Sequence, residues 1–119
     1  MLKIFGAALV AVLLTACASP YKSIYNTPDG KVLVVSKKDW ADFQEYLGKI
    51  GSTRKGAFAV GVYGGKTDGW ASNTCPAEVC YGGGSPAGSA MNNCREGGGE
   101  CVLFAINNQI LVNYKLADE

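Results

Sequence analysis

The amino-acid sequence predicts a small α+β domain, in which an antiparallel sheet of four or five strands packs with two helices and is stapled by disulfides. Three observations predict it. Short β-branched runs are separated by glycine and asparagine turns, two segments carry apolar residues at helical spacing, and four of the five cysteines lie between Cys75 and Cys101. A chain of 119 residues holds one domain.

The first strand and the first helix are expected between residues 31 and 51. Lys31–Val35 is a short β-branched run that favours a strand. A helix should follow over about residues 37–50, because Ser36 can cap its free N–H groups and Asp39 lies at the positive end of its dipole. Gly51 supplies its end. The apolar stripe of this helix, which we assign to the core, consists of Trp40, Phe43, Leu47 and Ile50.

Residues 57–63 form the next expected strand, and its two faces differ. Bulky side chains alternate with small ones along it, which suits a strand that is covered closely on both sides. A turn over residues 64–69 and a short returning strand over 69–72 should follow. Trp70 on that strand is expected to pack on the sheet; the alternative is that it forms a ligand-binding surface.

A second helix is predicted over Pro86–Arg95. Ser85 can cap it, and Pro86 suits the first turn, where a missing N–H is not needed. Its buried stripe should consist of Ala87, Ala90, Met91 and Cys94. A strand over residues 101–106, a turn at 107–109 and an antiparallel strand over 110–114 complete the expected fold.

The first 16 residues are typical of a secretory signal peptide, with Lys3 followed by an apolar run too short to span a membrane as a helix. Leu14-Thr15-Ala16-Cys17 resembles a bacterial lipobox, which implies that Cys17 becomes the lipidated N-terminus. The alternative is an ordinary signal peptide with a chance cysteine. We expect a cleaved leader over 1–16, a lipidated tether over 17–30 and a domain over 31–119.

Acyl chains on Cys17 would fasten the protein to a membrane, since two or more chains give stable anchoring. Ala18 follows the anchor where an aspartate would otherwise direct retention. By resemblance to the usual sorting pattern, the expected location is the periplasmic face of the outer membrane, and the inner membrane is less favoured.

Four cysteines remain once Cys17 is lipidated, and an even number in an oxidising compartment favours disulfides. Three pairings are possible. We favour Cys75–Cys80 with Cys94–Cys101 because both are local, and the second joins a helix to the adjacent strand. A zinc site of the same cysteines is the rival, but zinc sites usually have two-residue spacings and these gaps are longer. No metal or cofactor is expected.

The composition excludes several classes of function. Histidine is absent, which removes the Ser-His and Cys-His nucleophiles and histidine-ligated zinc. Without Lys3, basic and acidic residues are equal in number, so the domain carries no electrostatic footprint for nucleic acid. The glycine triplet at residues 82–84 precedes a helix, as in phosphate-binding loops, but it lacks the lysine and hydroxyl residue of those motifs.

Residues 56–112 resemble a family of exported bacterial domains, domain of unknown function 4189. The resemblance rests on a strand like residues 57–60, a glycine turn, Trp70 in a returning strand, a small-residue helix ending at Cys94, and Cys101 leading a strand into an asparagine turn. The loop from Cys75 to Cys80 is an addition to the family pattern. The family implies no catalytic residues for this chain.

Three functions are compatible with these features. The first is a non-enzymatic envelope module that binds a protein or a cell-wall glycan while its lipid holds it on the membrane. The second is a periplasmic inhibitor or immunity protein directed against a cell-wall hydrolase. The third is an enzyme that acts on glycans through carboxylates such as Asp68, Glu78 and Glu100, which would have to lie near one another.

Overall fold

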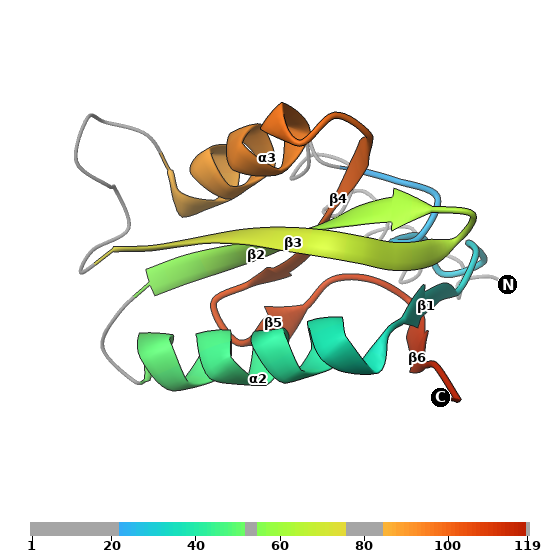
Figure 1. The fold of residues 1–119 in the computed structure, drawn as a ribbon, viewed down its shortest axis with the longest axis horizontal. Coiled ribbons are helices and arrows are strands. Elements are labelled where there is room, and N and C mark those ends of the chain that lie inside the picture. The colour runs from blue at the N-terminus through green and yellow to red at the C-terminus, as the bar shows by residue number, and fades with distance from the viewer. Residues whose placement is uncertain (1–21, 52–54, 76–84, 119) are drawn as a thin grey trace, which may run out of the picture.

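The computed structural model describes residues 22–51, 55–75 and 85–118. Within them, two helices lie on opposite sides of a six-stranded sheet (Figure 1). In chain order the elements are β1 (Leu33–Val35), α2 (Lys37–Ile50), β2 (Lys55–Tyr63), β3 (Lys66–Cys75), α3 (Pro86–Glu96), β4 (Glu100–Ile106), β5 (Gln109–Ile110) and β6 (Tyr114–Leu116). The α+β class and the two helices are confirmed.

The sheet is mixed, so the prediction of four or five antiparallel strands was wrong. The strand order is β5-β4-β2-β3-β1-β6. The neighbouring strands β3, β2, β4 and β5 pair antiparallel, whereas β1 pairs parallel to both β3 and β6. The expected strand over residues 110–114 accounts for the difference. The chain leaves β4 after Leu111, whose N–H donates to the Phe104 carbonyl, and continues alongside β1.

The sheet curls because both of its ends are built from one short stretch of chain. β5 and β6, which lie at opposite ends of the strand order, are separated by only three residues in the sequence. The rings of Phe104 on β4 and Tyr114 on β6 are accordingly 5.8 Å apart.

An aromatic layer fills the space between α2 and the sheet. Phe43 of α2 contacts Phe58 of β2 and Phe104 of β4 edge-on, with ring centroids 5.2 and 5.0 Å away. The predicted stripe of α2 faces this layer, with Phe43 and Ile50 buried and Trp40 and Leu47 packed against it. The helix begins where expected, since Ser36 Oγ accepts from the Asp39 N–H at 3.1 Å.

The opposite face of the sheet carries small residues and is covered by α3. Ala57 and Ala59 of β2 pack against Ala87, Ala90 and Met91 of the helix, with Leu103 of β4 beside them. Backbones can approach closely where side chains end at Cβ. The sequence prediction of a strand with a bulky face and a small face, covered on both sides, is confirmed.

The folded part of the chain includes residues 22–30, which the sequence analysis assigned to the lipidated tether over 17–30. Tyr25 is only 4% exposed and belongs to the aromatic core. Its carbonyl accepts from the Asn113 N–H at 2.7 Å, and the Thr27 carbonyl accepts from Asn113 Nδ2 at 2.8 Å. Residues 22–30 are therefore docked on the domain.

Two turns close the sheet. Gly64 and Gly65 both have positive φ and form a two-residue loop between β2 and β3, shorter than the expected turn over residues 64–69. Asn107, in the predicted asparagine turn, has φ 55°. Its carbonyl accepts from Tyr46 Oη at 2.8 Å and its side chain accepts from the Gly56 N–H at 3.1 Å, which ties the turn to α2 and β2.

Candidate functional site

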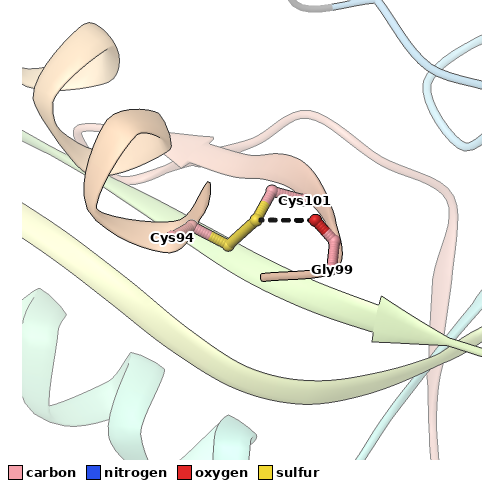
Figure 2. Close-up of a disulfide and its surroundings, with 3 residues drawn as sticks. All are labelled: Cys94, Gly99 and Cys101. Atoms are coloured by element: carbon pink, nitrogen blue, oxygen red, sulfur yellow. Dashed lines mark hydrogen bonds between the residues drawn. A yellow bond between two sulfur atoms is a disulfide. The ribbon is translucent and has the colours of Figure 1, made fainter. Parts of the chain in front are cut away.

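A disulfide between Cys94 and Cys101 joins the end of α3 to the start of β4 (Figure 2). Their Cα atoms are 6.1 Å apart. The predicted pairing of these two cysteines is confirmed. The dashed line in Figure 2 joins Cys101 Sγ to the Gly99 carbonyl oxygen at 4.0 Å. Because an oxidised sulfur carries no proton, this is a packing contact rather than a hydrogen bond.

Cys75 is buried at the end of β3 and is also disulfide-bonded. Its predicted partner Cys80 lies outside the described residues, as do the lipidation site Cys17 and the carboxylate Glu78. Sulfur atoms already bonded to each other are not thiolates, so Cys94 and Cys101 do not form the zinc site that was considered as the rival.

A hollow of about 330 Å³ lies beside the Cys94–Cys101 disulfide, between the end of α3 and the β2–β3 hairpin. We call it the glycine hollow, because bare backbone makes up much of its wall. The glycines that line it are Gly61 of β2, Gly69 of β3, and Gly97, Gly98 and Gly99 of the loop between α3 and β4.

Three of these glycines are required by the backbone. β3 bulges opposite Gly61, since Val60 pairs with Trp70 whereas Val62 pairs with Thr67. A Cβ on Gly61 would lie 2.7 Å from the Asp68 carbonyl oxygen, too close for any side chain. Gly69 in the bulge and Gly98 in the loop have φ of 92° and 90°, which favour glycine.

The other two glycines are not required. Neither Gly97 nor Gly99 has a positive φ. A Cβ on Gly99 would meet nothing within 4 Å, and one on Gly97 would make an ordinary contact 3.4 Å from the Cys94 carbonyl oxygen. Their absent side chains leave the hollow open without being needed for the fold.

Five of the residues that line the hollow are polar or aromatic, and we first take Tyr63, Asp68 and Asn93. Alternation along β2 places Tyr63 on the α3 face, since Val62 packs in the aromatic layer. Asp68 follows Thr67, whose hydroxyl accepts from the Ser36 N–H on the α2 face, so Asp68 also points to the α3 side. All three are exposed, and within the described residues none of them has a hydrogen-bond or ion-pair partner.

Glu100 also lines the hollow, but its carboxylate belongs to the other face of the sheet. It pairs with Val62 in register, and paired residues share a face. Strand alternation therefore separates the Asp68 and Glu100 carboxylates that the glycan-enzyme hypothesis needs together. The structure brings the two residues to one hollow without forming a carboxylate pair across it.

Trp70 is 39% exposed, and its ring is used in packing. It stacks on Phe58 with centroids 5.3 Å apart and planes 14° apart, on the α2 face. Its indole N–H donates to Asp42 Oδ2 at 2.7 Å. The expectation that Trp70 packs on the sheet is confirmed. The Trp70 ring faces α2 and its indole N–H is already hydrogen-bonded. Trp70 therefore lines the hollow with its backbone and not with its side chain.

The electrostatics of the glycine hollow are those of a polar surface that lacks cations, since its lining contains no lysine or arginine. Among the residues that the structure describes, no three histidine, cysteine or acidic side chains come together as metal ligands would. Within the described part of the chain the clear pKa shift lies away from the hollow, at Tyr46, where burial raises the pKa of the phenol to about 12.

Sequence reasoning missed Tyr63, Asn93 and the pair Gly61 and Gly69 as parts of a site. Asn93 lies outside the predicted buried stripe of its helix, and Gly61 is one of the small residues that alternate with bulky ones along the predicted strand. The Tyr-Gly-Gly run at residues 63–65 was the available signal, since a two-residue glycine turn leaves the residue before it at an exposed hairpin tip.

Comparisons of the chain with protein-family models, with curated proteins and with solved structures gave no match. The resemblance to the exported-domain family and to bacterial lipoproteins therefore stays a prediction from the quoted residues. Neither α2 nor α3, the helices of the described ranges, is long and apolar enough to cross a membrane.

Proposed function

We propose that this protein is an envelope lipoprotein, anchored through Cys17 to the periplasmic face of the outer membrane, whose domain is a non-enzymatic binding module for a cell-wall glycan or an envelope protein. The observation that carries the proposal is the glycine hollow. It is framed by a disulfide and a bulged strand, and the side chains of Tyr63, Asp68 and Asn93 have no hydrogen-bond or ion-pair partner within the described residues. Preformed concave sites with a few available polar groups are typical of binding sites.

The sulfur chemistry supports an exported location. Cys75, Cys94 and Cys101 are all oxidised, and stable disulfides are characteristic of compartments outside the cytosol. The same location is what the signal peptide and lipobox pattern predict.

The docking of residues 22–30 on the domain supports a short distance between the membrane and the folded domain. The chain is docked on the domain at the buried Tyr25. Eight Cα–Cα steps separate Cys17 from Tyr25, which span at most about 29 Å. A lipid on Cys17 would thus hold the glycine hollow near the bilayer, where an envelope partner would meet it.

Two measurements test this function. The intact mass of the protein extracted from membranes should show acyl chains on Cys17 and loss of residues 1–16; an unmodified Met1 chain would contradict the anchoring. A photo-crosslinking amino acid placed at Tyr63 in the cell should give a crosslinked product, and the same group at the exposed Ala41 of α2 should not.

The crosslinking also separates the proposal from its rivals. A product with a cell-wall hydrolase, together with protection of its substrate, would favour the inhibitor hypothesis. Absence of any product from position 63 in a folded, anchored protein would overturn the proposed binding role.

A further inference from the structure

We propose that the glycine hollow is a binding site for a short uncharged saccharide, with Tyr63 as the surface on which a sugar ring stacks. The inference rests on the proposed function, because it names the ligand class of the same site. It is carried by three independent features of the hollow: an unpacked aromatic ring, unpaired polar groups without a cation, and glycines that the backbone does not need.

Among the described residues, Tyr63 is the most exposed of the large hydrophobic side chains, at 82% exposure. The other rings on this part of the sheet are packed; Phe58, for example, contacts Trp70 and Phe43. Tyr63 makes no ring contact among the described residues, although it stands at the edge of a hollow. The face of a pyranose ring presents C–H groups, and a tyrosine face offers them an apolar, electron-rich surface with a hydroxyl at its rim.

The polar groups at the hollow suit hydroxyls. Asp68 can accept two hydrogen bonds from neighbouring hydroxyls, and Asn93 can both donate and accept. The Gly97 N–H is already used, since it donates to the Cys94 carbonyl at 3.1 Å, so the further backbone groups of this loop are those of Gly99. Because the hollow holds the Asp68 carboxylate and its lining has no cation, a phosphate or an acidic sugar would meet like charge and find no partner of opposite charge. The favoured ligand is therefore a neutral one.

The size and openness of the hollow agree with a small ligand. Its volume of about 330 Å³ is at the lower end of the range of small-molecule sites, which is about 300–1,000 Å³. Gly99 has room for a side chain and a backbone conformation that any residue can adopt, yet a side chain there would occupy the wall of the hollow. A glycine that the backbone conformation does not require is expected where a ligand must approach the backbone closely.

The test is a titration of the full-length, membrane-extracted protein, held in a detergent without a sugar headgroup, with chitotriose, cellotriose and triglucuronic acid. Binding of at least one neutral trisaccharide is expected, with at least about tenfold weaker binding of the acidic one, a difference of about 1.4 kcal/mol. Tyr63→Ala should weaken binding of the neutral sugar at least about tenfold, and Tyr63→Phe should leave it within about twofold, because the ring is retained.

Gly99→Leu provides the variant that blocks the hollow without disturbing the fold, and Gly48→Leu is its matched control. Both glycines have open space at Cβ, but Gly48 lies on the exposed side of α2. We expect Gly99→Leu to abolish saccharide binding with an unchanged thermal midpoint, and Gly48→Leu to bind as the natural chain does.

Each outcome is decisive for one proposal or the other. Failure of both neutral sugars to bind, or equal binding by Gly99→Leu, overturns the saccharide site. If sugars fail while position 63 still crosslinks to an envelope protein, the binding function stands and only the ligand class is wrong. If position 63 gives no crosslink but saccharide binding is lost in Gly99→Leu, the saccharide site stands and the cellular partner must be sought among free sugars.

Discussion

The two faces of the sheet are built on different principles. The face under α2 is filled by interlocking aromatic rings, in which Phe43, Phe58 and Phe104 contact one another. The face under α3 is filled by residues of the size of alanine, with Leu103 and Met91 as its larger members. One layer is held by large apolar side chains, and the other by close approach of backbones and a covalent bond.

The difference indicates a division of roles between the layers. Burial of large rings supplies most of the hydrophobic stabilisation, because that stabilisation scales with apolar area. The thin layer of small side chains under α3 buries less apolar area and supplies less hydrophobic stabilisation. The disulfide from Cys94 to Cys101 adds covalent stabilisation at the end of this layer, next to the glycine hollow. Stability is thus concentrated under α2, and the candidate site lies on the α3 face.

Truncation in the aromatic layer should have the largest effect on stability. Phe58 is 1% exposed and contacts rings from both sides, so Phe58→Ala should lower the free energy of unfolding by about 3–5 kcal/mol through lost burial and a cavity. Urea denaturation measures it. Tyr63→Ala on the same strand is the control and should cost less than about 0.5 kcal/mol, since the ring is exposed. Equal losses would refute the assignment of the core.

Local patterns sufficed for most of this two-layer arrangement. The cap at Ser36, the stripe containing Phe43, the cap at Ser85 and the small face of β2 were all predictable, because each depends on residues within a few positions of one another. The pairing of Cys94 with Cys101 followed from the same logic, since the helix face and the strand start had to meet.

The rest depended on contacts between distant segments. β6 is three residues long, and its direction is set by Asn113 bonding to Tyr25 and Leu33, more than 75 residues earlier in the chain. No local pattern distinguishes that strand from an antiparallel return. The glycine hollow was missed for a related reason, because it combines a strand bulge near Gly61 with a loop near Gly98, and a bulge is a property of register rather than of sequence.

Loss of the disulfide should have the next largest effect. Replacing both cysteines in Cys94→Ser/Cys101→Ser should lower the free energy of unfolding by about 2–3 kcal/mol, because the bridge closes a short loop in the unfolded chain. The measurement is urea denaturation without reductant, which leaves the Cys75 bridge intact. A double variant as stable as the natural chain would show that the α3 layer does not need its covalent bond.

Enlarging a small residue should reveal how tightly the α3 layer is packed. Ala59 is 0% exposed against α3, so Ala59→Val should cost about 1–3 kcal/mol by forcing the helix away from the sheet. Ala41→Val makes the same change at an exposed position of α2 and should cost only about 0.5 kcal/mol through helix propensity. If the two variants have the same thermal midpoint, the layers are not packed as described.

The smallest expected effect comes from the hydroxyl of Tyr46, at the far end of the aromatic layer from the disulfide. Burial raises the pKa of this phenol from 10.0 to about 12, and its hydroxyl donates to the Asn107 carbonyl at 2.8 Å. Between pH 10 and about pH 12 the Tyr46 phenol thus stays protonated in the folded protein, whereas it ionises in the unfolded chain. The contribution is fully present below pH 10 and is lost as the pH rises towards about 12.

Tyr46→Phe tests this pH dependence. At pH 7 the variant should be less stable by about 1 kcal/mol, because the hydrogen bond is lost. Between pH 10 and pH 12 the natural chain should lose stability because its Tyr46 phenol ionises more readily in the unfolded chain than in the folded protein. The variant has no phenol at position 46 and should not lose this part of its stability. The difference between the urea midpoints of the two proteins should therefore shrink as the pH rises. Other groups titrate equally in both proteins and cancel. A difference that stays constant over this range would mean that Tyr46 ionises as freely in the folded protein as in the unfolded chain, and that the aromatic layer admits water at the Asn107 turn.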